Sequence, residues 1–207
     1  MIALIDYDAG NMKSVEKALI HLGEKPVITR EREEILSADK VILPGVGCFG
    51  DAMENLHHFG LVPVIKQVVQ NQTPFLGICL GLQLLFERSE ESPGVEGLGL
   101  LKGEILRIPA AEGLKIPHMG WNNLTFPNKG RLFKEIEEHS YVYFVHSYYL
   151  KAKEEEIVTA ATEYGTYIHA SVEKGNLFAC QFHPEKSSSV GLQILKNFAG
   201  IAGKGGN

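Results

Sequence analysis

The first half of the chain alternates short apolar runs with helical patterns, and this alternation limits the possible folds more than any other feature. Helical periodicity lies between the runs, for example from Asn11, which we expect to cap a helix, to Gly23, which we expect to end it. Strands that alternate with helices form a parallel sheet covered on both faces. We therefore predict an open, mostly parallel, doubly wound α/β sheet. Its first strands are predicted over residues 1–6, 26–29, 41–43 and 75–78.

Strand-like runs follow one another in the C-terminal half, with little helical pattern between them. We expect them to form antiparallel hairpins added to one edge of the sheet. A last helix is predicted over residues 188–199, and the glycine- and lysine-rich residues 200–207 are typical of a flexible tail. One domain is thus expected over residues 1–199. The predicted late strands are 103–108, 122–126, 141–150, 157–162, 166–173 and 177–182.

Composition argues against several classes of protein. The formal net charge is −5 and no local run of basic residues occurs, which argues against a nucleic-acid partner. No run reaches the roughly 20 apolar residues that a membrane-spanning helix needs. Three cysteines in 207 residues are too few for a disulfide framework and favour a reducing, cytoplasmic setting.

The segment around Cys79 has the pattern of a nucleophile elbow. An apolar strand leads into Gly77-Ile-Cys79-Leu-Gly81, and a helix is predicted to follow. Glycine two positions before and after the nucleophile removes side chains that would clash in a strained turn. At the start of a helix, the dipole favours a thiolate, and the N–H of Leu80 is free to bind an oxyanion. The alternative is an inert, buried cysteine.

A second motif, Gln181-Phe-His183-Pro-Glu185, follows another apolar strand. If this segment is extended, His183 and Glu185 point to the same side, so the carboxylate orients the imidazole. The other ring nitrogen then faces Cys79 as base and later as acid. A surface histidine beside a turn proline is the alternative, but the preceding cysteine elbow favours a Cys-His-Glu triad.

A third motif, Pro44-Gly45-Val46-Gly47, follows the strand at 41–43, where open sheets place their ligand crevice. Its backbone can approach a substrate and complete an oxyanion hole, although a plain loop has the same composition. Gly45, Gly47 and Gly50 match a dinucleotide-binding spacing, but no acidic residue follows at the required place in a strand. No metal-ligand spacing occurs, so neither a cofactor nor a metal is expected.

Together, these motifs resemble those of the triad-type, class I glutamine amidotransferases, from residue 1 to about residue 199. Within that family, the chain is most similar to the glutaminase subunits of imidazole glycerol phosphate synthases. The features that carry this closer resemblance are Ile5–Ser14, Pro44–Phe49, Ile116–Asn122 and Tyr143–Tyr148.

The resemblance implies that Cys79 attacks the side-chain amide of glutamine and forms a glutamyl thioester. Gln83, Ser147 and Tyr148 would hold the substrate. The oxyanion would be bound at Val46, Gly47 and Leu80, and the glycine-rich segment would flip between inactive and active forms.

The resemblance also implies a partner, a (β/α)8-barrel cyclase subunit that forms a heterodimer with this chain. It would use the ammonia to make imidazole glycerol phosphate and the carboxamide ribonucleotide of purine synthesis, in histidine biosynthesis. Trp121, Asn122 and Tyr143 would face it, although aromatic residues on a hairpin are also common in cores and at edges.

Three other functions are compatible with the pattern. One is the glutaminase of another ammonia-using synthase, such as that of vitamin B6, which usually carries Gly-Gly-Glu-Ser in place of Pro44–Gly47. The others are a cysteine hydrolase or stress protein of related fold, and a binding subunit that keeps the elbow only as scaffold. Cys48 and Cys180 are interpreted as packing residues, and no role is assigned to His118 or His146.

Overall fold

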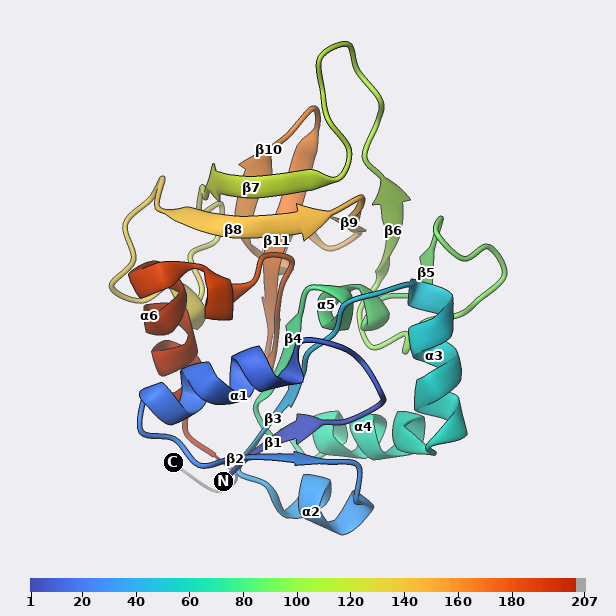
Figure 1. The fold of residues 1–207 in the computed structure, drawn as a ribbon, viewed down its shortest axis with the longest axis vertical. Helices are drawn as coiled ribbons and strands as arrows, with labels where there is room; N and C mark the ends of the chain where they lie inside the picture. The colour runs from blue at the N-terminus through green and yellow to red at the C-terminus, as the bar shows by residue number, and fades with distance from the viewer. Residues whose placement is uncertain (204–207) are drawn as a thin grey trace.

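The computed structural model describes residues 1–203, so residues 204–207 of the expected tail lie outside the described residues. Within the described residues, the central sheet has seven strands in the order β10-β11-β12-β4-β3-β1-β2 (Figure 1). The five strands from β12 to β2 are parallel, and β10 and β11 add an antiparallel edge. The strands are β1 (Ile2–Ile5), β2 (Pro26–Thr29), β3 (Lys40–Leu43), β4 (Phe75–Ile78), β10 (Val158–Glu163), β11 (Tyr167–Lys174) and β12 (Leu177–Cys180). The doubly wound α/β fold is therefore confirmed.

Two hydrophobic layers cover the sheet, because successive side chains of a buried strand point to opposite faces. On β1, Ala3 and Ile5 pack with α2, α3 and α4, whereas Ile2 and Leu4 pack with α1 and α6. The helices are α1 (Met12–His21), α2 (Arg32–Ser37), α3 (Phe49–His58), α4 (Leu61–Gln70), α5 (Leu80–Leu84) and α6 (Ser188–Ala199). The periodicity had not singled out α3, whose apolar residues lie directly after the glycine-rich loop.

The remaining strands form two small sheets instead of extending the central one. One contains β5 (Arg88–Ser89), β6 (Gly103–Arg107) and β9 (Tyr148–Ala152), and the other pairs β7 (His118–Asn123) with β8 (Tyr141–His146). Figure 1 shows the β7–β8 hairpin lying across the upper end of the molecule, beyond the tip of β4. Short 3₁₀ turns occur at η1 (Arg131–Phe133), η2 (Glu155–Ile157) and η3 (Pro184–Lys186).

Two strand predictions in this half differ from the structure. The run predicted over 141–150 is interrupted at Ser147, where β8 ends and β9 turns to pair with β6. The strand predicted over 122–126 lies instead at His118–Asn123, because pairing with β8 decides its position rather than its own hydrophobicity. Residues 87–97 are acidic and contain glycine, a composition that predicts a solvated loop, but they contain β5, and Ser89 is buried.

Candidate active site

The backbone of Cys79 is strained. Its φ of 55° and ψ of −108° lie where residues with a side chain rarely occur. A Cβ atom on Gly77 would lie 2.6 Å from the carbonyl oxygen of Gly81, and one on Gly81 would lie 1.9 Å from that of Leu43. Only glycine fits at these two positions, so the turn has the geometry expected of a nucleophile elbow.

Three neighbouring parallel strands bring the three sequence motifs to one edge of the sheet. Strand β12 pairs with β4 so that Cys180 lies beside Ile78, and the N–H of Cys79 donates to the Cys180 carbonyl at 2.8 Å. On the other side, β3 pairs with β4 through Leu43 and Gly77. Because the strands end together, Cys79, the Gln181–Glu185 segment and the Pro44–Gly47 loop all meet at their carboxyl ends.

Glu185 orients the ring of His183. Its Oε1 lies 2.8 Å from Nδ1 of His183, and both side chains are fully buried. The segment is not extended as predicted, because Pro184–Lys186 forms the turn η3. The turn nevertheless brings the two side chains together. Ser187 fixes this turn, since its hydroxyl donates to the His183 carbonyl at 2.6 Å and accepts from the Tyr143 N–H at 2.9 Å.

Asn11 is a site residue that sequence reasoning missed. It stands at the N-cap of α1, as expected, but its side chain makes no capping hydrogen bond. Instead, its amide donates to Oε1 of Glu185 at 2.5 Å and lies 3.4 Å from Nδ1 of His183. A capping asparagine and a site asparagine look alike in sequence, so no local signal could separate the two roles.

The His183 ring carries a proton readily. Burial by itself lowers the pKa of this imidazole, but hydrogen bonding and charge interactions with Cys79 and Glu185 outweigh it and raise the pKa to about 9. Within residues 1–203, Nε2 of His183 is buried and has no hydrogen-bond partner, so it is left to exchange a proton with Cys79. The ring is thus held between a carboxylate and the thiol group, as a proton-transferring histidine must be.

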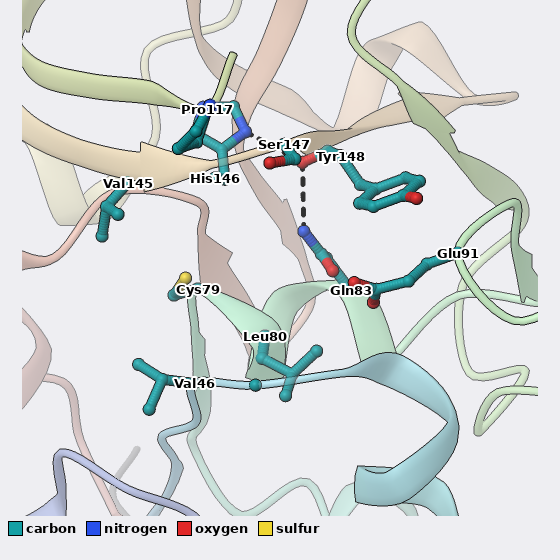
Figure 2. A pocket seen from close by; sticks show the side chains of 11 residues that line it. Val46, Cys79, Leu80, Gln83, Glu91, Pro117, Val145, His146, Ser147 and Tyr148 are labelled. Atoms are coloured by element: carbon teal, nitrogen blue, oxygen red, sulfur yellow. Dashed lines mark hydrogen bonds between the residues drawn. The ribbon is translucent and has the colours of Figure 1, made fainter.

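A cavity of about 310 Å3 opens beside Cys79 (Figure 2). Its walls contain every residue predicted to bind substrate or oxyanion, together with Glu91, which sequence reasoning had placed in a solvated loop. The lining residues are Val46, Gly47, Cys79, Leu80, Gln83, Glu91, Pro117, Val145, His146, Ser147 and Tyr148.

The orientation of the Gln83 amide follows from its partners. Its Nε2 donates to the Tyr148 carbonyl and to Oε1 of Gln181, each at 3.1 Å. Gln181 is fully buried, and its own Nε2 points at the sulfur of Cys79 at 3.7 Å. Both Gln83 hydrogens are therefore used, and its Oε1 is the group left to accept a hydrogen bond from a ligand.

One expected oxyanion donor is occupied. The N–H of Leu80 donates to the carbonyl of Gly45 at 3.3 Å. Tyr7 holds the same loop, because its hydroxyl donates to the Pro44 carbonyl at 2.9 Å and would meet a Cβ atom on Gly45 at 2.0 Å. The loop thus turns a carbonyl, rather than an N–H, toward the expected oxyanion position at Leu80.

The three residues expected to face a partner do not all lie on one face of the β7–β8 hairpin. Trp121 is 52% exposed and lies 6.0 Å from Tyr143, centroid to centroid, with Met119 exposed on the same face of the strand. Asn122 points to the other face, where its amide donates to the Glu163 carbonyl at 2.9 Å. Trp121 and the half-buried Tyr143 therefore form an aromatic face, and the Asn122 side chain does not belong to it.

Three further observations concern the described part of the chain. Cys48, Cys79 and Cys180 are free thiols. No cluster of three or more potential metal-ligating side chains occurs among residues 1–203. The helices in that range are also too short or too polar to cross a bilayer.

Comparison with known proteins places this site in a family. The family model described as glutamine amidotransferase class-I matches residues 3–201. The chain belongs to the class-I glutamine amidotransferase family.

Relatives that match over the full length of the chain belong to one kind of subunit within this family. The chain is 54% identical to imidazole glycerol phosphate synthase subunit HisH of Moorella thermoacetica, covering 100% of this chain and 97% of that protein. It is 49% identical to the subunit HisH of Methanocaldococcus jannaschii, over 96% of this chain and 98% of that one.

Solved structures share the fold at lower identity. A crystal structure of a glutamine amidotransferase superposes with a TM-score of 0.74 at 20% identity, over 96% of this chain and all of that one. The structure of PurLQS from Thermotoga maritima also gives 0.74, at 21% identity, with 96% of each chain covered.

Proposed function

We propose that this chain is the glutaminase subunit of imidazole glycerol phosphate synthase and supplies ammonia for histidine biosynthesis. Its relatives at about half identity over the whole chain carry that name. One observation supports the chemistry most directly. Cys79 has a strained backbone and lines the cavity, and the buried His183–Glu185 pair belongs to the same site.

The reaction uses these residues in order. The Cys79 thiolate attacks the side-chain amide carbon of glutamine, and the protonated His183 gives its proton to the departing nitrogen, so ammonia leaves and a glutamyl thioester remains. Water then attacks the thioester while His183 removes its proton, which releases glutamate and the free thiolate. Glu185 keeps the imidazole oriented in both steps, helped by Asn11.

Glutamine fits the polar groups that line the cavity. Oε1 of Gln83 is free to accept from the substrate's α-ammonium group, and the Glu91 carboxylate adds a negative charge for the same group. Ser147 and Tyr148 line the opposite wall beside His146 (Figure 2). This assignment places the side-chain amide of glutamine toward Cys79.

The conformation of the Pro44–Gly47 loop explains why the isolated chain should have little activity. With the Gly45 carbonyl bonded to the Leu80 N–H, the oxyanion loses one donor and meets a carbonyl oxygen. The peptide between Gly45 and Val46 must rotate before the N–H groups of Val46, Gly47 or Leu80 can bind an oxyanion, and glycine makes such a rotation possible. Loss of one donor costs on the order of 10²–10³ in rate, so the chain alone should be nearly inactive.

The partner in this proposal is a cyclase subunit with a (β/α)8-barrel fold, bound as a heterodimer and consuming the ammonia. The aromatic face of Trp121 and Tyr143 supports it, because Val145, on the same strand as Tyr143, also lines the cavity. A partner on this face would cover the place from which ammonia leaves. The cytoplasmic location stays a prediction.

The test is a glutaminase assay on the chain, with and without the cyclase subunit and its nucleotide ligand. We expect wild type to release glutamate in the complex and almost none alone. Cys79→Ala should abolish glutaminase activity while the complex still makes product from added ammonia. Full turnover by the isolated chain would contradict the idle resting loop, and an active Cys79→Ala complex would contradict the nucleophile.

A further inference from the structure

Two buried histidines face each other on the hairpin that lies over the site. His118 on β7 and His146 on β8 are cross-strand partners and are 3% and 6% exposed. Nδ1 of His118 lies 3.0 Å from Nε2 of His146. The His118 ring is stacked on Tyr164, with centroids 3.9 Å apart, and on Phe144, at 4.7 Å. Buried polar groups held this closely need a defined pattern of hydrogens.

The partners determine which nitrogen carries each hydrogen. Nδ1 of His146 lies 2.8 Å from the Tyr148 carbonyl, which can only accept, so this nitrogen carries a hydrogen. In a neutral ring, Nε2 of His146 then accepts from Nδ1 of His118. Nε2 of His118 is left as an acceptor that faces the amide nitrogen of Asn122 at 3.4 Å.

Neither ring has an environment suited to a positive charge. Burial lowers the pKa of His118 to about 4, and burial together with the neighbouring His118 and His183 lowers that of His146 to about 3. The Tyr148 carbonyl partly offsets this effect at His146 without reversing it. Both rings therefore stay neutral at pH 7, each with its hydrogen on Nδ1.

The histidine pair ends on the carbonyl that holds Gln83. The Tyr148 carbonyl accepts from His146 and also from Nε2 of Gln83 at 3.1 Å. Gln83 continues to Gln181, whose amide reaches the sulfur of Cys79. One network of hydrogen bonds thus runs from β7 to the nucleophile, and the two histidines form its β7 end.

We propose that His118 and His146 are positioning residues: the neutral pair fixes the Tyr148 carbonyl, which fixes the Gln83 amide and so sets the affinity for glutamine. This inference rests on the proposed function, because it assigns Gln83 to the glutamine site. Neither histidine takes part in proton transfer to the substrate, and their effect passes through the backbone of Tyr148.

The first test reads the hydrogens directly. Long-range ¹H–¹⁵N NMR of the ¹⁵N-labelled chain at pH 7.5, with His118→Phe and His146→Phe spectra for assignment, should show both rings neutral with the hydrogen on Nδ1. A hydrogen on Nε2 of either ring, or a charged ring, would overturn the proposal. This measurement does not depend on any glutaminase activity.

The second test is kinetic and uses the complex with the cyclase subunit. His118→Phe keeps the ring stacking but removes the donor to His146, so we expect the KM for glutamine to rise roughly tenfold with kcat within about threefold of wild type. His118→Asn keeps a donor near the same position and should restore KM to within about threefold of wild type.

Tyr164→Phe is the matched control, because it keeps the stacking on His118 and removes only the hydrogen bond to the Lys115 carbonyl. Its KM should equal that of wild type. A His118→Phe protein with lower thermal stability but unchanged KM would show a purely structural role and overturn the proposal. A wild-type complex without glutaminase activity would refute the proposed function, while the NMR result would still decide the histidine arrangement.

Discussion

At the scale of single residues, the site depends on buried polar groups that have few partners. Glu185 shows this most clearly, because its Oε1 receives both the His183 ring and the Asn11 amide, while its Oε2 has no hydrogen-bond partner in the described residues. Removing one partner leaves a buried group unsatisfied, which costs more than the net value of the hydrogen bond. Changes at these residues should therefore lower stability as well as disturb the orientation of His183.

Asn11→Ala should lower kcat/KM for glutamine roughly tenfold in the complex, because Glu185 loses a donor and holds His183 less firmly. Steady-state kinetics measure it. Asn128→Ala is the matched control, since that amide is also hydrogen-bonded, but only to the Glu155 and Val158 carbonyls. Equal losses in the two variants would argue against a role for Asn11 in orienting Glu185.

The raised pKa of His183 predicts how stability changes with pH. Its pKa of about 9 in the folded chain exceeds the ordinary value of 6.5, so the protonated ring stabilises the fold fully below pH 6.5. This contribution is lost as pH rises through 9. The difference in unfolding free energy between wild type and His183→Gln should shrink by roughly 3 kcal/mol from pH 6 to pH 9.5.

Urea unfolding at several pH values measures this difference. His169→Gln is the control, because burial lowers the pKa of His169 and its effect on stability is confined to pH below the ordinary value. The difference in unfolding free energy between wild type and His169→Gln should stay flat above about pH 7.5, where the His183→Gln difference still shrinks. A flat profile for His183→Gln as well would show that the ring is not held in its protonated form.

At the scale of elements, the pairing of adjacent strands brings together residues that are far apart in the sequence. Strands β12, β4 and β3 are neighbours in the sheet, so Gln181 reaches Cys79 although the two residues are 102 positions apart in the chain. The close approach of β3 to α5 leaves no room for a side chain at Gly81, because the Leu43 carbonyl is in the way. The elbow is thus as much a contact between elements as a local turn.

Gly81→Ala should destabilise the chain by about 3 kcal/mol or more, since its Cβ atom would overlap a backbone oxygen that cannot move freely. Gly94→Ala is the control. Gly94 has a φ of 85°, but no atom lies within 4 Å of the position that an added methyl group would occupy, so only backbone strain of about 1–2 kcal/mol is expected. Chemical denaturation compares the two, and equal effects would contradict the packing explanation.

At the scale of the whole molecule, the two small sheets turn a doubly wound scaffold into a covered site. The β7–β8 hairpin supplies His146 to the cavity wall from one face and presents Trp121 and Tyr143 from the other. Figure 1 shows this hairpin at the end of the molecule, away from the chain termini. The same element can therefore meet a partner and line the cavity beside Cys79.

Trp121→Ala should weaken binding of the cyclase subunit by about 2 kcal/mol, or roughly 30-fold in Kd, because large exposed aromatic residues are typical interface hot spots. Calorimetric titration measures it. Tyr167→Ala is the control, since Tyr167 is 45% exposed but lies on β11, outside the β7–β8 hairpin. Unchanged binding by Trp121→Ala would remove the aromatic face from the proposed interface.

The sequence by itself determined the fold class, the family and the positions of the main motifs. Strand periods and helical periods are local, so the strand Phe75–Ile78 and the helix Ser188–Ala199 could be predicted to the residue. The requirement for Gly77 is also local, because its Cβ atom would meet the Gly81 carbonyl of the same turn, whereas the limit at Gly81 comes from Leu43 on β3. Ser147 and Tyr148 could be named only through the resemblance.

Tertiary structure alone decided which side chains complete the site. Asn11, Glu91 and Gln181 reach it through long-range packing, and sequence patterns had suggested a helix cap for Asn11 and a solvated loop for Glu91. The carbonyl that Gly45 turns toward Leu80 is likewise invisible in the sequence, because glycine permits either orientation of that peptide. Hydrogen bonds between distant segments depend on how the sheet closes, and only the folded chain fixes that.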